Sequence, residues 1–598
     1  MHLTTRSLFH GHPCDWHPEK RINRLNMQAK WFWIGLMCLE ISSLAQGKVD
    51  LPKSTEHLLI DMVPMRDGVN LFTTIELPQK DKKYPVVLLR NLYRKRTDEI
   101  KEPGDVAKRN FIFIHQDVRG AGRSEGEWHA FLQERNDGED CLEWIVKQPW
   151  CDGNIFMTGG SYCGSSQFLA AACGNPALKG IAPEILAMDY FTPMTQRDGV
   201  PTLALFNWAC WCTFNNLGLK EDNPRPKYDD AHVAWRERDI TALNRPVHFW
   251  RQMTNPQAFD EYFKQMDAKD FISKIPCPAY LLSGWYDIDA SAELKVFTAL
   301  REHGGNERVR QFTHCVMGPY THGSVAGFPG VTETQETRNK LHDRQNQFFI
   351  NLFKDENSDP LPDMKPITYY VMGANEWRGA ETWPPQGTTF TSYYLGGGSA
   401  NTLAGNGFMK ASLEETSEDI FISNPLNPVP TVGGRWEDGA KEQTAPLGGR
   451  KDVLFYRSDV LTEPLEIAGP VKARLFISCS TPETDIAVKV ADVFPDGKAY
   501  NIVNGIKRTS FRAPYKKLEP MEPGKVYELE FELQSTAHRF LPGHRMMVII
   551  AGQDYGYFVF NRNTGKDDSL DASCQKAEIR IYHTQQHPSA IILPVSAK

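Results

Sequence analysis

The sequence lacks any apolar run long enough to cross a lipid bilayer. Its best candidate, Trp31–Leu39, has nine residues, whereas a helix needs about 20 residues to span the hydrocarbon core. Long blocks of like charge are also missing, and 67 basic residues nearly balance 74 acidic ones, for a net charge of −7. We therefore expect no stable membrane insertion and no nucleic-acid partner.

A framework for binding metal is missing as well. The 12 cysteines are scattered, without a Cys-x-x-Cys pair or a Cys/His cluster at zinc spacing. No phosphate-binding glycine loop is visible, so we expect no cofactor. Cys141 with Cys151, or Cys210 with Cys212, could form a disulfide in an oxidising compartment, but spacing does not decide the pairing. We interpret these cysteines as small buried apolar residues.

The N-terminal region has the order of parts found in a secretory signal. Lys30 precedes the apolar run 31–39, and the small residues Ser43-Leu44-Ala45 follow it as a cleavage site. We interpret residues 1–45 as an N-terminal extension that carries a signal peptide at 27–45. The acidic residue late in the apolar region is unusual for such a signal. The expected location is therefore periplasmic or secreted if the signal is used, and cytoplasmic otherwise.

The first half of the chain has the rhythm of a parallel sheet. A length of 598 residues corresponds to about two or three domains. Short apolar runs alternate with helical patterns, which is typical of buried parallel strands joined by helices. The runs are 85–89, 111–114, 154–157, 279–282 and 315–317. We assign residues 50–183 and 275–365 to one α/β domain.

Two regions depart from this rhythm. Residues 184–274 are rich in Trp, Phe and Asn with irregular helical spacing, which predicts a helical cap inserted over the sheet. Beyond residue 366 the period becomes two, and in Val526–Leu533 apolar residues alternate with glutamates, as in a half-solvated antiparallel strand. We predict that residues 366–598 form an all-β jelly roll, with the polar stretch 424–449 as a surface loop.

One serine lies in the sequence context of a nucleophile elbow. Thr158-Gly159-Gly160-Ser161-Tyr162-Cys163-Gly164 follows an apolar run and opens a helix of small residues. Small neighbours are needed there because strand and helix approach closely, and Gly159 and Gly164 meet that need. The strict Gly-x-Ser-x-Gly form is not met, since Cys163 occupies the place of the second glycine. We predict Ser161 as a nucleophile; the alternative is a glycine-rich turn with an incidental serine.

A serine hydroxyl needs a histidine to take its proton and a carboxylate to orient that histidine. In this strand, turn and helix context the chain order is Ser, acid, His, each beyond the end of a strand. Asp287 follows the run 279–282, and His322 follows the run 315–317. Two competitors are Asp289, which lies two residues after Asp287, and His314, which precedes its strand. His322 is therefore the better candidate for the base. Alone, each residue is more often solvated or structural, and their shared order favours catalysis.

The tetrahedral intermediate of acyl transfer also needs hydrogen-bond donors for its oxyanion. The backbone N–H of Tyr162, directly after the predicted nucleophile, supplies one donor. A second donor must come from the loop after an early strand, where Tyr93 lies. From position alone, an aromatic packing role for Tyr93 is favoured.

Six ordered motifs resemble the family of cocaine esterase and X-Pro dipeptidyl-peptidases, which also contains α-amino acid ester hydrolases. They are Val63-Pro64-Met65-Arg66-Asp67-Gly68-Val69, Gln116-Asp117-Val118-Arg119-Gly120, Ser124-Glu125-Gly126, Gly159-Gly160-Ser161-Tyr162-Cys163-Gly164, Gly284-Trp285-Tyr286-Asp287 and Gly318-Pro319-Tyr320-Thr321-His322. The resemblance implies an α/β-hydrolase domain, an inserted helical cap and a C-terminal jelly roll. It also implies that Ser161, Asp287 and His322 form a catalytic triad, with Tyr93 and the Tyr162 N–H as the oxyanion hole.

The resemblance leaves the substrate open. The α-amino acid ester hydrolases bind a substrate ammonium group through a carboxylate cluster, two of whose members lie two and three residues after the triad acid. Asp289 and Ala290 occupy these positions here, so one acid is present and one is absent. Asp198 in the cap is a loosely aligned third member. Asp289 is equally open to interpretation as a solvated acid at a helix start.

These observations predict a serine hydrolase of acyl esters or amides with a short acyl group that bears an α-amine. The runner-up is an X-Pro dipeptidyl-peptidase that releases N-terminal dipeptides. An alternative of another class is a non-catalytic protein whose jelly roll binds a glycan or a partner. The expected partner is a small-molecule or short-peptide substrate, and the sequence does not decide the oligomeric state.

Overall fold

The computed structural model describes residues 53–94, 109–186, 199–216, 232–255, 262–288, 290–436, 438–512 and 518–597. The predicted signal at 27–45 lies outside these residues, as do Asp198 and Asp289. Within the described ranges, no helix combines the length and the hydropathy needed to cross a membrane.

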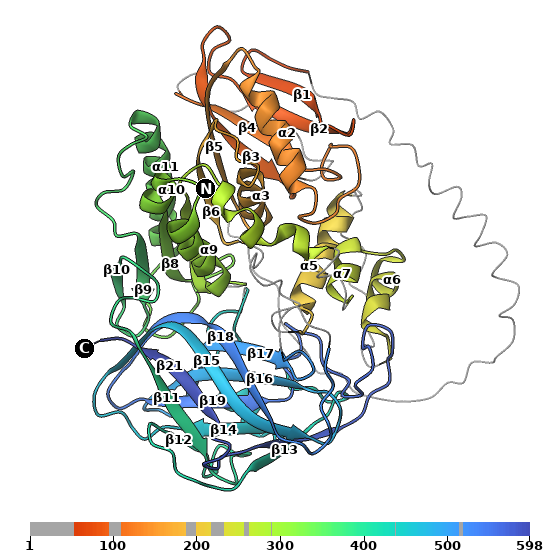
Figure 1. Ribbon diagram of the computed structural model, residues 1–598, viewed down its shortest axis with the longest axis vertical. Coiled ribbons are helices and arrows are strands. Elements are labelled where there is room, and N and C mark those ends of the chain that lie inside the picture. Colours follow the sequence, from red (N-terminus) through yellow and green to blue (C-terminus); the bar gives the residue numbers. More distant parts are fainter. Residues whose placement is uncertain are drawn as a thin grey trace, which may run out of the picture. The chain divides into compact units, whose positions relative to one another are not determined.

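In the described part of the chain, ten strands form the first sheet, in the order β1-β2-β4-β3-β5-β6-β7-β8-β9-β10 (Figure 1). They are β1 (Leu58–Pro64), β2 (Asn70–Glu76), β3 (Tyr84–Asn91), β4 (Ile112–Asp117), β5 (Cys151–Gly160), β6 (Leu178–Glu184), β7 (Tyr280–Tyr286), β8 (His314–Thr321), β9 (Ile367–Val371) and β10 (Glu376–Ala380). Every pair from β4 across to β9 is parallel. The five predicted apolar runs lie on these strands, so that expectation is confirmed.

Helices cover both faces of this sheet. In β5, Ile155 and Met157 share an apolar cluster with Leu142 of α2 (Glu134–Val146). The intervening Phe156 packs instead with Phe348 of α11 (Gln335–Lys354). Successive side chains of a strand point to opposite faces, so a continuous apolar run fits a sheet that is buried on both sides. The other helices that the structure describes in this domain are α3 (Tyr162–Ala171), α9 (Ala290–His303) and α10 (Glu307–Phe312).

A helical cap lies between β6 and β7, as predicted. Its described helices are α5 (Leu203–Asn216), α6 (Arg238–Leu243) and α7 (His248–Met253), followed by short 3₁₀ turns between Phe263 and Lys274. Several backbone hydrogen bonds tie the cap to the C-terminal domain. The Leu203 N–H donates to the Tyr557 carbonyl, and the Trp235 N–H donates to the Asp568 carbonyl.

Among the described residues, eleven strands form the second sheet, which builds the C-terminal jelly-roll domain. Its order is β13-β20-β15-β21-β11-β12-β14-β19-β16-β17, and β18 pairs with β15. The strands are β11 (Thr389–Gly396), β12 (Phe408–Lys410), β13 (Asp419–Ser423), β14 (Val453–Arg457), β15 (Leu465–Cys479), β16 (Asp485–Val493), β17 (Ala499–Arg508), β18 (Tyr527–Phe540), β19 (Arg545–Ala551), β20 (Ala577–Ile581) and β21 (Ala590–Val595). In β18, Leu529 and Phe531 are buried while Glu528 and Glu530 are exposed, which confirms the predicted period of two.

The predicted domain boundary at residue 366 does not coincide with the division between the two sheets. Strands β9 and β10 continue the first sheet, since β9 pairs with β8 in parallel and β10 pairs with β9. The second sheet begins only at Thr389. A short strand pattern carries no signal for which sheet edge its backbone joins, and that pairing depends on contacts distant in sequence.

The interpretation of 424–449 as a surface loop is also wrong in part. Arg435, Ala440 and Gln443 are buried, and Thr444–Leu447 forms the short helix α12. The Arg435 guanidinium donates to the carbonyls of Asn504 and Leu533, which are distant in sequence. Polar composition predicted solvent exposure here because these internal partners are not visible in the sequence.

Candidate active site

Ser161 lies on a sharp turn between β5 and α3. Its backbone has φ 58° and ψ −125°, a combination that non-glycine residues rarely adopt and that functional sites often hold under strain. The Ser161 N–H donates to the Glu184 carbonyl of the neighbouring strand β6 at 2.9 Å, and the Ser161 carbonyl accepts from the Ser165 N–H at 3.0 Å. These bonds fix the turn so that the hydroxyl projects from the carboxyl end of the sheet.

The glycines around Ser161 are required by close approach. A Cβ atom on Gly159, whose φ is +128°, would lie 2.6 Å from Leu89 Cδ1 and 2.7 Å from Cys163 Cβ. A Cβ atom on Gly164 would lie 2.8 Å from the Glu184 carbonyl oxygen. Both predicted close approaches are confirmed. Cys163 is accommodated at the place of the usual second glycine because Gly164 takes the contact with β6.

A continuous hydrogen-bond chain joins Ser161 to the two residues predicted to act with it. His322 Nε2 lies 2.9 Å from Ser161 Oγ, and His322 Nδ1 lies 2.7 Å from Asp287 Oδ1. Asp287 follows β7 and is almost fully buried, whereas His322 directly follows β8. A buried carboxylate beside Nδ1 holds the tautomer in which Nε2 is free to accept the serine proton.

The Asp287 carboxylate is held by its own partners. The Ser283 hydroxyl donates to Asp287 Oδ2 at 3.1 Å, and the Ile288 N–H donates to Asp287 Oδ1 at 2.6 Å. These bonds fix the orientation of the carboxylate toward His322.

Two donors converge beside the serine hydroxyl. The Tyr93 hydroxyl donates to Ser161 Oγ at 3.0 Å, and the Tyr162 N–H donates to the Tyr93 hydroxyl at 3.3 Å. Burial raises the pKa of Tyr93 well above its usual value, so the phenol remains a donor. This arrangement can accept a carbonyl oxygen between both groups, and it favours a donor role for Tyr93 over simple packing.

The Tyr162 side chain anchors the turn that carries Ser161. Its hydroxyl donates to Glu134 Oε1 at 2.8 Å and accepts from the Trp128 Nε1–H and the Phe131 N–H, each at 3.2 Å. Glu134 also pairs with Arg90 at 3.0 Å, and both side chains are buried. Glu134 and Trp128 were not predicted from the sequence, because nothing in their local patterns marks them as partners of Tyr162.

Aromatic side chains from the cap border the site. Trp211 of α5 lies 6.0 Å from Tyr93 between ring centroids. Trp208 of the same helix packs on Phe131, Trp128 and Tyr162. The cap therefore contributes an apolar wall next to the predicted oxyanion donors.

The C-terminal domain reaches the site through Trp436. The indole stacks on the His322 ring with centroids 5.0 Å apart and ring planes 22° apart. The Trp436 carbonyl accepts the His322 backbone N–H at 2.8 Å. Trp436 was not predicted from the sequence, since the polar composition of residues 424–449 predicts a surface loop.

The competing histidine has a separate, structural partner. His314 opens β8 at the opposite end from His322, is buried, and lies 2.9 Å from Asp359. Asp198 and Asp289 lie outside the described residues, so their predicted ammonium site stays a prediction. In the part of the chain that the structure describes, no group of three or more His, Cys, Asp or Glu side chains is arranged to hold a metal ion. The ten cysteines among these residues are free thiols.

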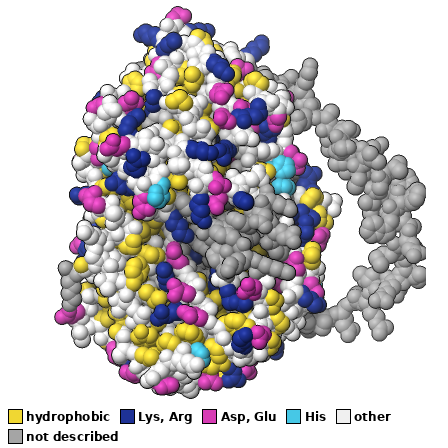
Figure 2. Space-filling view, in the orientation of Figure 1, with side chains coloured by type: hydrophobic (Ala, Val, Ile, Leu, Met, Phe, Trp, Pro, Cys, Tyr) yellow, Lys and Arg dark blue, Asp and Glu magenta, His cyan; other side chains and the backbone are white. Residues whose placement is uncertain are grey.

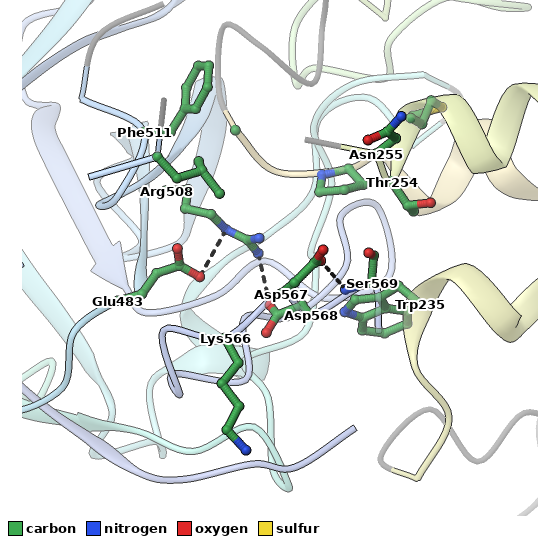
Figure 3. Close-up of a pocket in the computed structure, with 14 residues that line it drawn as sticks. Trp235, Thr254, Asn255, Glu483, Arg508, Phe511, Lys566, Asp567, Asp568 and Ser569 are labelled. Atoms are coloured by element: carbon green, nitrogen blue, oxygen red, sulfur yellow. Dashed lines mark hydrogen bonds and ion pairs between the residues drawn. The ribbon is translucent and has the colours of Figure 1, made fainter. Parts of the chain in front are cut away.

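A cavity lies between the cap and the C-terminal domain, and neither Ser161 nor His322 lines it. Figure 3 shows Arg508 extended toward Glu483 and Asp568, and Trp235 of the cap also lines this cavity. The ion-pair distances from Arg508 are 3.8 Å to Glu483, 3.3 Å to Asp568 and 3.0 Å to Asp485.

On the face of the molecule shown in Figure 2, positive and negative side chains are interspersed.

Two stretches that together span most of the chain match known families. Residues 67–324 match the family described as X-Pro dipeptidyl-peptidase (S15 family). Residues 362–592 match the X-Pro dipeptidyl-peptidase C-terminal non-catalytic domain. Over 570 residues, the chain is 32% identical to cocaine esterase of Rhodococcus sp. (strain MB1 Bresler), in an alignment that covers 89% of this chain and 97% of that protein.

Solved structures share the fold at lower identity. An α-amino acid ester hydrolase superposes with a TM-score of 0.76 at 24% identity, covering 92% of this chain and 100% of its own. An aminopeptidase from the marine sediment archaeon Thaumarchaeota archaeon gives the same TM-score and identity over 93% of this chain and 100% of its own. This likeness establishes the α/β-hydrolase domain followed by an all-β domain.

Proposed function

Since this chain belongs to the family of cocaine esterase and the X-Pro dipeptidyl-peptidases, we propose that Ser161, His322 and Asp287 are the catalytic triad of this serine hydrolase. The observation that carries the proposal is the unbroken hydrogen-bond chain from Ser161 Oγ through His322 to Asp287. A vestigial site in a non-catalytic binding protein would not need this geometry, so the binding alternative has no support from it.

Acylation follows from the positions of these atoms. The Ser161 oxygen attacks the acyl carbon as its proton passes to His322 Nε2, while Asp287 stabilises the imidazolium through Nδ1–H. The carbonyl oxygen becomes an oxyanion that accepts hydrogen bonds from the Tyr93 hydroxyl and the Tyr162 N–H. When the bond to the leaving group breaks, His322 returns the proton to the departing alcohol or amine.

Deacylation repeats these steps with water. His322 Nε2 takes a proton from the attacking water, the oxygen adds to the acyl carbon, and the same two donors hold the oxyanion. Collapse of this intermediate breaks the bond to Ser161 Oγ, which regains its proton from His322. The products are a carboxylic acid and free enzyme, and no cofactor enters the balance.

We propose esters with a short acyl group as the preferred substrates. The identity of 32% to an esterase over nearly the whole chain favours esters over peptides, and the indoles of Trp208 and Trp211 provide an apolar wall. A free α-amine on the acyl group would be bound by Asp289 with Asp198, a proposal that depends on their sequence positions alone. X-Pro dipeptidyl-peptidase activity is the second candidate, because both family matches carry that description.

A panel of four chromogenic substrates tests this proposal. It comprises an acetyl ester, an aminoacyl ester, an aminoacyl anilide and an Ala-Pro anilide. We expect turnover of both esters, with higher kcat/KM for the aminoacyl ester, and loss of that preference in Asp289→Asn. Preferential cleavage of the Ala-Pro anilide would establish the peptidase alternative instead.

Two serine variants provide the matched controls for the panel. Ser161→Ala must abolish turnover of every substrate that the wild type cleaves. Ser273→Ala, at an exposed serine of the cap, must leave turnover unchanged. Activity that persists in Ser161→Ala would contradict the proposal.

A further inference from the structure

A short hairpin of the C-terminal domain presents Trp436 to the site. Gly434 and Gly439 exchange two backbone hydrogen bonds, at 2.7 Å and 3.1 Å, and so close a tight loop around Trp436. Directly beyond the loop, the Ala440 N–H donates to the Ala326 carbonyl of the hydrolase domain at 2.8 Å. The loop is therefore fastened to the segment that follows His322.

The base of this hairpin is fixed from within the C-terminal domain. The buried Arg435 guanidinium donates to the carbonyls of Asn504 in β17 and Leu533 in β18, at 3.1 Å and 2.9 Å. It also lies over the Phe558 ring, 5.8 Å from its centroid. The segment that carries Trp436 is thus attached to the C-terminal domain through Arg435 and to the hydrolase domain through Ala440.

The backbone of Trp436 adopts an unfavourable conformation. Its φ of 74° lies in the left-handed region, where a bulky side chain is a genuine outlier. Such strain persists where the surrounding structure imposes it, and it concentrates at functional sites. The contacts that impose it here are the hairpin bonds and the two contacts with His322.

We propose that Trp436 is a positioning residue for the reaction, and thus that the domain described in the family as non-catalytic holds the general base in place. Its carbonyl fixes the His322 main chain, and its indole covers one face of the imidazole. The inference rests on the proposed function, since it assigns a task only if His322 carries the proton.

Two physical effects follow from the stacked indole. It blocks rotation of the imidazole away from the line between Ser161 Oγ and Asp287 Oδ1, which keeps Nε2 within reach of the proton. It also offers an aromatic face to the imidazolium that forms during each proton transfer, an attraction that acts only on the charged ring. Asp287 is the charged side chain that hydrogen-bonds to His322 among the described residues, so the indole adds to its effect from a different direction.

Three substitutions at this position separate positioning from folding. Trp436→Ala removes the indole but keeps a Cβ in the left-handed region. Trp436→Gly removes the indole and relieves the backbone strain, so it should unfold at the same or a higher temperature than Trp436→Ala. Trp436→Phe keeps an aromatic face. Leu426→Ala, at a side chain that is 65% exposed in the same stretch, is the control.

We expect kcat for the acetyl ester to fall about 10- to 100-fold in both Trp436→Ala and Trp436→Gly, because a small misplacement of the base has that cost. KM should change little, Trp436→Phe should recover most of the kcat, and Leu426→Ala should match the wild type. The rate at which a small fluorophosphonate labels Ser161 should fall in parallel with kcat, because labelling uses the same proton transfer.

Other outcomes overturn the inference in distinguishable ways. A rise in KM at unchanged kcat would make Trp436 a wall of the substrate pocket, not a positioning residue. Full activity of Trp436→Gly would show that the indole is dispensable. If the wild type neither hydrolyses an ester nor takes the label at Ser161, the proposed function itself fails, and with it the task assigned to Trp436.

Discussion

Tyr93 and the Tyr162 N–H form a pair of donors in which one is a side chain and can be removed alone. Tyr93→Phe deletes the hydroxyl and leaves the backbone donor in place. Since loss of one oxyanion donor weakens transition-state binding, kcat for an ester should fall about 100- to 1000-fold with a small change in KM. Steady-state kinetics on the acetyl ester measures this directly. An unchanged kcat would show that the Tyr93 hydroxyl is not an oxyanion donor and that Tyr93 only packs against its neighbours.

The Tyr162 hydroxyl supports the second donor through contacts on the other side of the turn. Tyr162→Phe leaves Glu134, Trp128 and the Phe131 N–H without their shared partner in a buried site, which should lower the free energy of unfolding by about 1–3 kcal/mol. We expect kcat to fall as well, because the turn that carries Ser161 loses its anchor. Denaturant unfolding and ester kinetics measure the two effects.

The control for Tyr162→Phe is Tyr582→Phe, which deletes a hydroxyl bonded to Ser478 in the C-terminal domain. It should leave kcat unchanged. If both variants had the same effect on kcat, or if Tyr162→Phe were fully active, the anchoring role of Tyr162 would be wrong.

At the scale of structural elements, the hairpin around Trp436 depends on Gly439. A Cβ atom at Gly439 would lie 2.3 Å from the Ala326 carbonyl oxygen, and φ there is +63°. Gly439→Ala should therefore displace the hairpin, lower the melting temperature and lower kcat. Gly497→Ala is the matched comparison, because φ there is +87° but the space around it is open. Equal kcat in the two variants would show that the hairpin position does not affect catalysis.

The elements that local patterns determine were predicted well. Continuous apolar runs such as 85–89 identify strands that are buried on both faces, and the glycines at 159 and 164 identify a turn that only close approach explains. Chain order then brought Ser161, Asp287 and His322 into one prediction, and the structure places them in one hydrogen-bond chain. Each of these features depends on a pattern within a few consecutive residues.

The features that depend on distant partners were not predictable. Nothing in residues 367–380 indicates that their backbone pairs with β8 and not with the later strands. Trp436 lies in a polar stretch, and its contact with His322 requires the arrangement of two domains. Glu134 is recognisable as a partner of Tyr162 only once α2 and α3 are packed together.

At the scale of the whole molecule, the junction of cap and C-terminal domain contains a buried excess of acid. Arg508 faces Glu483, Asp485 and Asp568, and burial raises the pKa of Asp568 from 3.8 to about 7 and also raises that of Asp485. At a pH between 3.8 and about 7, the folded protein retains a proton on Asp568 that the unfolded chain has released. Stability therefore falls as the pH rises from about 4 to about 7, and stays lowered above that range.

Asp568→Asn removes this titration, because the amide is neutral at every pH. The melting temperature of the wild type should decrease more between pH 5 and pH 8 than that of the variant, and the variant should be the more stable of the two at pH 8. Differential scanning fluorimetry at both pH values measures this. A difference between wild type and variant that does not change with pH would contradict the assignment to Asp568.

The central claim is that Ser161 is the nucleophile of a working triad. The most direct measurement is covalent labelling of the wild-type protein with a fluorophosphonate, followed by mass spectrometry of its peptides. The account predicts one adduct, on the peptide that contains Ser161, with ester hydrolysis lost in proportion to labelling. An adduct on another residue, or full hydrolysis by the protein labelled at Ser161, would contradict it.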